Sequence, residues 1–322
     1  MIDQPLLQVK NLCTYFQLPK PHPFGKAATV FAVDDVSFEI SRGQTFGLVG
    51  ESGCGKSTTA MSVLRLVEPT SGSVILDNQD IGQLKGDELR SFRRHMQIVF
   101  QDPYSSMNPR ATACEIVGAS LKIQRIGTKK SREAKVTHLF KMVGLRPEQR
   151  DLFPHQFSGG QRQRIAIARA LASKPQFIVC DEPVSALDVA IQAQILNLLR
   201  RLQEELNLTY LFISHDMAVI QHMCDQIAVM YMGQIVETAD RRSLFLNVQH
   251  PYTKALLSAI PTIDLDVKPS SKRLEGDVPS PMDPPPGCRF HTRCPMSEDI
   301  CKREIPQLRE VKTNHLVACH LV

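Results

Sequence analysis

A phosphate-binding loop is the feature that most constrains the fold of this chain. Residues Gly50–Ser57 have the sequence Gly-Glu-Ser-Gly-Cys-Gly-Lys-Ser, which satisfies the pattern G-x-x-x-x-G-K-S. An apolar run, Thr45–Val49, precedes the loop, and helix-forming sequence from Ser57 to Leu66 follows it. Because the pattern binds phosphate when it joins a strand to a helix, this context predicts a nucleoside-triphosphate site in an α/β fold.

Each part of the loop has a chemical task. The glycines let the backbone curl so that successive N–H groups face one anion, and the following helix N-terminus adds donors and its dipole. Lys56 is expected to reach the β- and γ-phosphates, and the Ser57 hydroxyl to ligate Mg²⁺. The residues expected to contact the nucleotide here are Gly50, Ser52, Gly53, Cys54, Gly55, Lys56, Ser57 and Thr58. Since Cys54 lies near the helix N-terminus, we expect a lowered thiol pKa and loss of ATP binding on alkylation.

Other apolar runs are expected to be further strands of the sheet that contains the strand before the loop. The segments Gln97–Phe100, Phe177–Cys180 and Tyr210–Ile213 are rich in branched and aromatic residues, and helical patterns such as Ile191–Leu206 separate most of them. Alternating strands and helices predict a mainly parallel sheet covered on both faces. Residues 102–165 interrupt this alternation with helix-forming sequence, and we expect them to form an inserted helical subdomain.

Two carboxylates end the strand at 177–180. In a parallel sheet, the C-terminal end of such a strand lies beside the phosphate loop. Asp181 is therefore expected to hold Mg²⁺, directly or through water. Glu182 is expected to act on the attacking water, either as the general base or as the group that orients it. Together with the phosphate loop, this pair predicts Mg²⁺-dependent hydrolysis of a phosphoanhydride.

A second glycine-containing helix start lies at Ser158–Gln161, ahead of a long helical run. By the same physics it is a second anion-binding helix N-terminus. One chain then has two phosphate-facing surfaces, which is more than one bound nucleotide needs. Two chains arranged head to tail would use all four surfaces on two nucleotides, so we expect a dimer of this kind.

The order of these motifs resembles that of the ATP-binding-cassette (ABC) ATPases, over residues 6–250. The resemblance implies a P-loop ATPase core in which an antiparallel β portion and the inserted helical subdomain accompany the mainly parallel sheet. It implies that Gln101 reaches Mg²⁺ and the attacking water, and that His215 contacts the γ-phosphate. A phosphate-loop kinase is a poor alternative, because such a kinase has no use for Ser158–Gln161 or His215.

The same resemblance assigns residues to the dimer interface and to the binding of adenine. Ser158, Gly159, Gly160 and Gln161 would close on the γ-phosphate bound by the other subunit. Asp188 belongs to the loop that links the two sites. The adenine is expected to stack on Phe16, with Tyr15 as the weaker candidate.

Finer features resemble ATPase subunits of bacterial dipeptide and oligopeptide importers, which nickel importers partly share. These features are the segments Gln101–Arg110 and His250–Leu257 and the cysteine-containing C-terminus. The resemblance implies ATP hydrolysis that drives peptide uptake through two separate transmembrane permease subunits, with an extracytoplasmic protein delivering the solute. The second ATPase subunit is expected to be a related, non-identical chain. Import of nickel or another solute stays the alternative.

The domain organisation follows from a change in composition. We expect residues 1–260 to form the cassette and residues 261–322 to form an extension. Seven prolines fall within residues 261–287, which predicts an extended linker. Beyond it lie Cys288, Cys294, Cys301 and Cys319, whose thiolates favour a [4Fe–4S] cluster or Zn²⁺, with free thiols as a third possibility. The cluster is preferred because no C-x2-C pair is present and because the resemblance implies it.

Composition and charge bear on the cellular location and the partners of this chain. No apolar run in the 322 residues approaches the roughly 18 needed to span a bilayer, and the N-terminus lacks a secretory signal. We therefore expect a peripheral protein on the cytoplasmic face of the bacterial inner membrane. The net charge of +5 and pI of about 8.7 fall below the range typical of nucleic-acid binders, so no nucleic-acid partner is expected. A non-transport ABC protein of DNA repair or translation is the remaining alternative.

Overall fold

The computed structural model describes residues 4–19, 28–258 and 276–322. These residues divide into two compact units. The first unit contains Gln4, residues 41–44 and residues 83–213. The second unit contains the described parts of residues 5–40, 45–82 and 214–322. Each unit has its own strands and helices, which are described in turn.

Three parallel strands form the sheet of the first unit. They are β6 (Met96–Val99), β7 (Phe177–Asp181) and β8 (Thr209–Ser214), with β7 in the middle. Every residue of β7 and β8 is buried. Burial on both faces explains why these strands are continuous apolar runs in the sequence. The three expected strands are confirmed, each within one residue of the predicted start.

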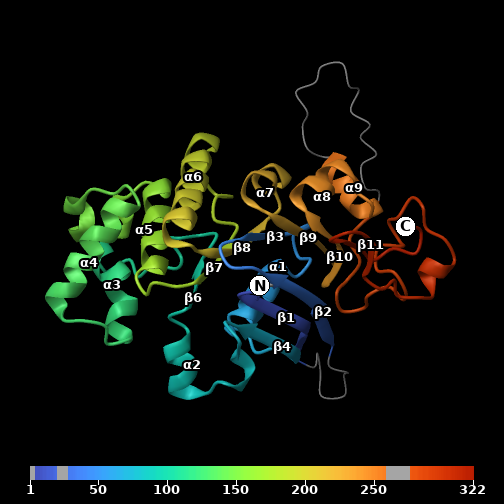
Figure 1. Ribbon diagram of the computed structural model, residues 1–322, viewed down its shortest axis with the longest axis horizontal. Helices are drawn as coiled ribbons and strands as arrows, with labels where there is room; N and C mark the ends of the chain where they lie inside the picture. The colour runs from blue at the N-terminus through green and yellow to red at the C-terminus, as the bar shows by residue number, and fades with distance from the viewer. Residues whose placement is uncertain (1–3, 20–27, 259–275) are drawn as a thin grey trace. The chain divides into compact units, whose positions relative to one another are not determined.

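Helices make up the rest of the first unit. They are α2 (Gly86–Phe92), α3 (Ala113–Ile123), α4 (Lys129–Met142), α5 (Gly159–Leu171) and α6 (Val189–Leu206), with short 3-10 turns at Pro147–Asp151 and Pro154–Gln156. Figure 1 shows α3, α4 and α5 gathered into one bundle. Thr112 begins α3 with a capping box, since its hydroxyl accepts from the N–H of Glu115 and the Glu115 carboxylate accepts from its N–H. The expected helices are present, and the boundaries 102–165 of a separate subdomain stay a prediction.

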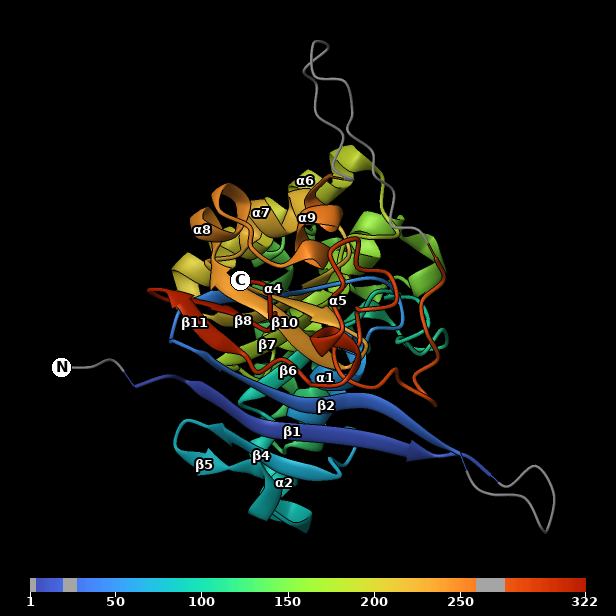
Figure 2. The same ribbon diagram turned by 90° about the vertical axis from the view of Figure 1, so that its right-hand side faces the viewer.

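An antiparallel sheet opens the second unit. Its strands are β1 (Leu7–Gln17), β2 (Thr29–Ile40), β4 (Ser71–Leu76) and β5 (Gln79–Asp80), in the order β2-β1-β4-β5. Figure 2 shows β1, β2 and β4 side by side. Helix α1 (Lys56–Val63) packs on this sheet, where the buried hydroxyls of Thr14 and Ser62 lie 2.8 Å apart. The antiparallel portion implied by the resemblance is therefore confirmed.

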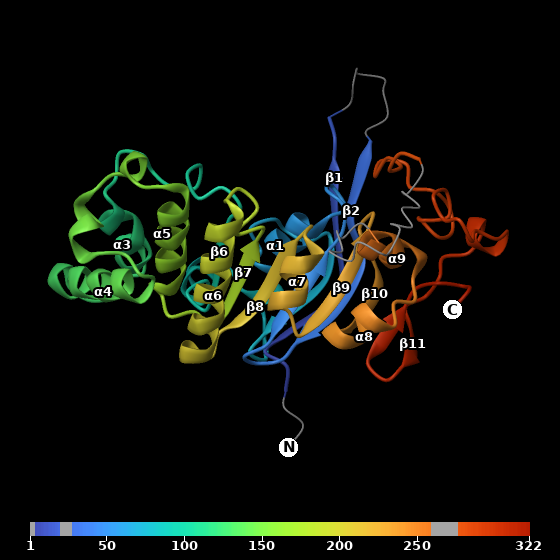
Figure 3. The same cartoon turned by 90° about the horizontal axis from the view of Figure 1, so that it is seen from above.

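The phosphate loop's strand belongs to the other sheet of the second unit. β3 (Thr45–Val49) pairs in parallel with β9 (Gln226–Tyr231), and β10 (Gln234–Asp240) pairs antiparallel with β9. Helices α7 (Met217–Met223), α8 (Arg241–Leu246) and α9 (Pro251–Ser258) lie along one side of these strands in Figure 3. The bounds of β3 are those expected from the sequence.

The C-terminal residues extend that sheet. Strand β12 (His315–Val317) pairs with β10, and β11 (Arg309–Lys312) pairs with β12. The extension also contains a 3-10 turn at Ile300–Lys302. Residues 276–287 form no helix or strand, as the prolines predict, whereas residues 261–275 of the expected linker lie outside the described residues.

The extension buries its apolar side chains against the second unit. Phe290 is 1% exposed, and its ring centroid lies 5.2 Å from that of Tyr231 and 5.3 Å from that of Tyr252. Val317, in β12, is fully buried. A segment of this length cannot enclose a core of its own, so it uses the surface of β9, β10 and α9.

Candidate functional site

The phosphate loop leaves the buried strand β3 and enters α1 through Gly55. Gly55 has φ 106°, and a Cβ there would lie 2.2 Å from the carbonyl oxygen of Ala32, so only glycine fits. Lys56 is 5% exposed, and its Nζ donates to the carbonyl oxygens of Gly50 and Glu51, each at 2.9 Å. The loop is thus folded around its own lysine, while Ser52 and Gly53 are exposed at its tip.

Sequence reasoning missed two residues that contact this loop. The N–H of Glu51 donates to the hydroxyl oxygen of Tyr252 at 2.9 Å, and the Glu51 carboxylate pairs with the guanidinium of Arg293. Tyr252 lies in the segment His250–Leu257, which the sequence analysis identified only by its resemblance to peptide importers. No local signal identifies either contact, because the partners are 201 and 242 residues apart.

The two candidates for stacking adenine lie near the end of β1. Phe16 is 39% exposed, so its ring has a free face. The Tyr15 hydroxyl donates to the carboxylate of Asp34, and its ring packs edge-on against Phe31 with centroids 4.9 Å apart. Because Tyr15 is already engaged, the geometry favours Phe16 for the stacking role.

His215 follows β8 and is exposed in the second unit. The next residue, Asp216, caps α7 by accepting from the N–H of Ala218 at 2.8 Å. The cap fixes the backbone where the strand ends, and His215 stands at that turn. Its contact with a γ-phosphate stays a prediction.

The two carboxylates lie where they were expected, at the C-terminal end of β7 in the first unit. Asp181 is 7% exposed. Glu182 has φ 47°, and its N–H donates to the carbonyl oxygen of Ile213 at 3.0 Å. A positive φ in a non-glycine residue is uncommon, and such backbone strain clusters at functional sites. The backbone turns at Glu182, so this residue lies outside β7, in which Asp181 is buried.

The helix start at Ser158–Gln161 is present as predicted, whereas its binding of an anion stays a prediction. Ser158 caps α5 in a capping box with Gln161, with donor–acceptor distances of 3.0 and 3.4 Å. A Cβ on Gly160 would lie 2.6 Å from Cγ2 of Ile191, so glycine allows α5 to approach the start of α6 closely. Asp188 is the exposed residue that precedes α6. The first unit therefore brings Ser158–Gln161 and the Asp188 segment together.

Gln101 is exposed just after β6, at the start of a loop that α5 holds in place. Arg169 donates to the carbonyl oxygen of Ser106 at 2.7 Å and to its hydroxyl at 3.1 Å. The guanidinium of Arg162 lies 4.9 Å from the ring centroid of Tyr104, within the range of a cation–π contact. These two arginines connect the helix that begins at Ser158 to the loop that begins at Gln101, and sequence reasoning did not identify them.

The expected lowering of the Cys54 thiol pKa is wrong, whereas the loss of ATP binding on alkylation stays a prediction. Cys54 is 5% exposed, and burial raises its pKa in spite of the nearby Lys56 ammonium. Desolvation of the thiolate outweighs the favourable charge. The Cys54 side chain faces the protein interior, so we expect alkylation of this thiol to be slow. Any contact of Cys54 with the nucleotide would be made by its backbone.

The four cysteines of the extension are free thiols. Burial, to which the neighbouring Cys301, Cys319 and Cys294 add, raises the pKa of Cys288 to about 11. Across the described residues, no group of three or more His, Cys, Asp and Glu side chains is arranged to hold a metal ion. The structure therefore gives no support of its own to the expected iron–sulfur cluster or to zinc, and that assignment stays a prediction.

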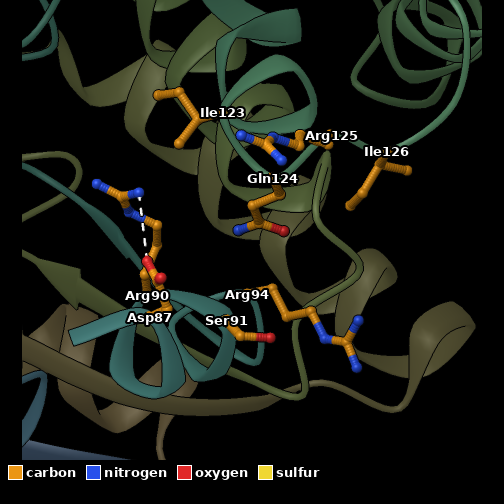
Figure 4. Close-up of a pocket in the computed structure, with 8 residues that line it drawn as sticks. All are labelled: Asp87, Arg90, Ser91, Arg94, Ile123, Gln124, Arg125 and Ile126. Carbon is orange, nitrogen blue, oxygen red and sulfur yellow. Dashed lines mark ion pairs between the residues drawn. The ribbon is translucent and has the colours of Figure 1, made fainter. Parts of the chain in front are cut away.

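A basic cavity of about 340 Å³ lies in the first unit between α2 and the end of α3 (Figure 4). Of its lining residues, Arg90 lies in α2, Arg94 follows the end of that helix, and Arg125 lies in the turn after α3. Asp87 is the acidic lining residue and pairs with Arg90 at 3.6 Å. Ile123 borders the cavity and is 67% exposed. Three guanidinium groups beside an exposed apolar side chain suit an acidic peptide segment.

A buried carboxylate joins the extension to β10 and α9. Glu237 is fully buried and accepts from the N–H groups of Gln249 at 2.8 Å and His250 at 3.1 Å. Nε2 of His315, in β12, lies 2.7 Å from the same carboxylate. One side chain thus connects β10 to the residues just before α9 and to β12.

His250 predicts a loss of stability in acid. Burial, with the Lys254 charge adding, lowers its pKa from 6.5 to about 3, so the folded state disfavours the proton that the unfolded chain accepts. Its contribution is complete above about pH 6.5 and is lost as the pH falls toward 3. We expect a loss of about 1.4 kcal/mol per pH unit from pH 6 to pH 4. Urea unfolding at several pH values measures the free energy of unfolding. We expect a plot of this free energy against pH to have a shallower slope for His250→Gln. The control His138→Gln, at an exposed position, should leave that slope unchanged.

Two family models match the chain on either side of these sites. Residues 33–185, which include the phosphate loop and Glu182, match the model described as "ABC transporter". Residues 236–301 match the model described as "Oligopeptide/dipeptide transporter, C-terminal region". The second match spans Glu237, Tyr252 and Arg293, which connect the extension to the second unit.

Individual proteins resemble the chain over nearly its whole length. A putative peptide import ATP-binding protein of Brucella ovis is 51% identical over 319 residues, covering 99% of this chain and 98% of the relative. The oligopeptide transport ATP-binding protein AppF of Bacillus subtilis is 48% identical over 322 residues, with 99% and 98% covered. A dimeric ATP-binding cassette solved with ADP and Pi matches with a TM-score of 0.65 and 31% identity, covering 73% of this chain and 99% of that one. With the phosphate loop, the strand-end carboxylates and the capped second helix in place, the chain belongs to the ABC transporter ATPases, in the family of oligopeptide and dipeptide transporter ATP-binding proteins.

Proposed function

We propose that this chain hydrolyses ATP to drive the import of short peptides through separate transmembrane subunits. The observation that carries the proposal is the match of residues 236–301 to the oligopeptide/dipeptide transporter C-terminal region, in a chain that also has the complete phosphate loop. Relatives named for peptide import align over 98–99% of both lengths, so the likeness is not confined to the ATPase core. Nickel import, the alternative, has no comparable support among these relatives.

Reconstitution tests the proposed substrate. The chain would be purified with its permeases and partner ATPase, placed in vesicles and supplied with an extracytoplasmic peptide-binding protein. We expect di- or oligopeptides to raise ATP hydrolysis and to accumulate in the vesicles, and chelated nickel to do neither. Stimulation by nickel alone would contradict the proposal, and co-purification with ribosomes or nucleic acid instead of permeases would favour the non-transport alternative.

The proposed division of labour at the ATP site follows the sequence motifs. Lys56 binds the β- and γ-phosphates, and Ser57, Gln101 and Asp181 hold Mg²⁺, which neutralises charge on the phosphates. Glu182 activates or orients water, and His215 contacts the γ-phosphate. The helix N-terminus at Ser158 binds the γ-phosphate of the partner subunit's nucleotide, because capped N–H groups of a helix start favour an anion.

The chain needs partners for this role. Among residues 4–19, 28–258 and 276–322, no helix is long and apolar enough to cross a bilayer. We place the chain on the cytoplasmic face of the inner membrane, in a head-to-tail dimer with a related ATPase and below two permeases. The basic cavity beside Ile123 supports docking of an acidic permease segment, since its three arginines would attract such a segment. Reversing Arg90 and Arg94 to glutamate should therefore weaken co-purification of the permeases.

The extension is proposed to bind a [4Fe–4S] cluster through Cys288, Cys294, Cys301 and Cys319, with Zn²⁺ as the alternative. The Cys288 thiol interacts electrostatically with those of Cys294, Cys301 and Cys319, which supports the proposal. Burial raises the pKa of Cys288, Cys294 and Cys319, so a bound metal would displace the protons that these three thiols retain. Anaerobic purification should give a brown protein with about four iron atoms and matching labile sulfide per chain. A colourless protein containing zinc would select the alternative, and one without either metal would refute both.

A further inference from the structure

The C-terminal extension contacts the phosphate loop directly. Both terminal nitrogens of Arg293 donate to the Glu51 carboxylate, at 2.7 and 3.1 Å. The Arg293 side chain is 6% exposed and that of Glu51 is 29% exposed, so the pair is largely removed from water. The guanidinium carbon also lies 5.9 Å from the ring centroid of Tyr231 in β9. A buried, bidentate pair of this kind has one geometry, unlike an exposed ion pair.

Other bonds fix Glu51 from two further directions. Its N–H donates to the Tyr252 hydroxyl at 2.9 Å, and its carbonyl oxygen accepts from Lys56 at 2.9 Å. The side chain, the N–H and the carbonyl of this one residue are therefore all engaged. Glu51 lies immediately after Gly50, so its position sets the path by which the backbone enters the loop.

A second arginine of the extension, Arg289, contacts β2 and the turn after β9. Arg289 donates to the Asp34 carboxylate and to the carbonyl oxygen of Met232. Asp34 in turn accepts from the hydroxyl of Tyr15, which precedes Phe16 in β1. Phe290, between the two arginines, packs on the rings of Tyr231 and Tyr252 and keeps both arginines in place.

We propose that the extension is a positioning element for the nucleotide and that Arg293 is its central residue, acting through Glu51 on the phosphate loop. Neither side chain needs to contact ATP. Their pair fixes the loop backbone before the nucleotide arrives, so that less order has to be gained on binding. Arg289 does the same, through Asp34, for the strand that bears Phe16.

A double-mutant cycle on nucleotide affinity tests this proposal in the full-length chain. The dissociation constant of a fluorescent ATP analogue with Mg²⁺ would be measured for Arg293→Ala, Glu51→Ala and the double variant. We expect each single variant to weaken binding by about tenfold and the double variant to be no weaker than either, because both changes break one interaction. Additive losses in the double variant would overturn the proposal.

Companion variants separate positioning from general stability. Arg293→Lys keeps the charge but loses the bidentate geometry, and should bind the nucleotide with intermediate affinity. Lys302→Ala removes an exposed ion pair with Asp299 in the same extension and should change neither affinity nor melting temperature. If Arg293→Ala does not fold, the cycle is run with Arg293→Lys and Glu51→Gln. A lowered melting temperature with unchanged nucleotide affinity would show a merely structural role and would overturn the proposal.

Discussion

Replacing Glu182 with glutamine is expected to lower ATP turnover by about 10²–10⁴-fold while leaving ATP binding intact. Glutamine has the size of glutamate but cannot accept the proton of the attacking water. The turn at φ 47°, whose N–H donates to Ile213, keeps position 182 at the end of β7, so the substitution should not move the backbone. With hydrolysis blocked, ATP should stay bound between two subunits.

Size-exclusion chromatography with ATP and Mg²⁺ checks this expectation, because the variant should elute as an ATP-containing dimer. Steady-state phosphate release measures the loss of turnover. Glu205→Gln is a matched control, since Glu205 lies on the same unit in an exposed pair with Arg201 at 3.8 Å. Normal hydrolysis by the Glu182 variant would show that this residue neither activates nor orients the water.

Removing the buried carboxylate of Glu237 should lower the free energy of unfolding by about 3–5 kcal/mol. Alanine at this position leaves the N–H groups of Gln249 and His250, and Nε2 of His315, without their buried acceptor. Each unpaired buried donor is costly, and the three donors lie in two segments, residues 249–250 and β12. The extension should therefore detach from β10 before the rest of the second unit unfolds.

Urea denaturation with limited proteolysis measures both effects. We expect the Glu237→Ala variant to be cleaved within residues 276–322 under conditions that leave the original chain intact. Glu298→Gln, an exposed position in the extension, should behave like the original chain. Combining Glu237→Ala with His315→Ala should cost less than the sum of the two, because both remove one contact. A loss below 1 kcal/mol would mean that the carboxylate is not needed for docking.

The parallel strands and the phosphate loop could be predicted because their signals are local. Burial on both faces requires continuous apolar runs, so β3 has the predicted bounds and α6 begins two residues before the predicted Ile191. The helix start at Ser158–Gln161 could be predicted from its place ahead of a long helical run, and the structure adds that Gln161 completes a capping box there. Each of these features depends on neighbours within a few positions.

The remaining parts of the site depend on distant neighbours. The pKa of Cys54 is raised because other segments bury the thiol, and a helix N-terminus read from the sequence could not reveal this. The contacts of Arg169 with Ser106 and of Arg293 with Glu51 join residues 63 and 242 positions apart. Arginines near helices and cysteines are common, so nothing in the sequence distinguished these from solvated ones.

The sequence by itself determined the chemical groups of the site, because each of them is a local motif of a few consecutive residues. These motifs are the phosphate-binding loop, the two carboxylates after a buried strand and the second capped helix start. Only the tertiary structure decided what supports that chemistry. Arg293, Tyr252 and Glu237 acquire their roles from pairing across the second unit, where burial turns ordinary polar groups into specific bonds. Two of the four cysteines that stand out in the sequence, Cys288 and Cys294, are chain neighbours of Arg289 and Arg293, whose contacts only the structure revealed.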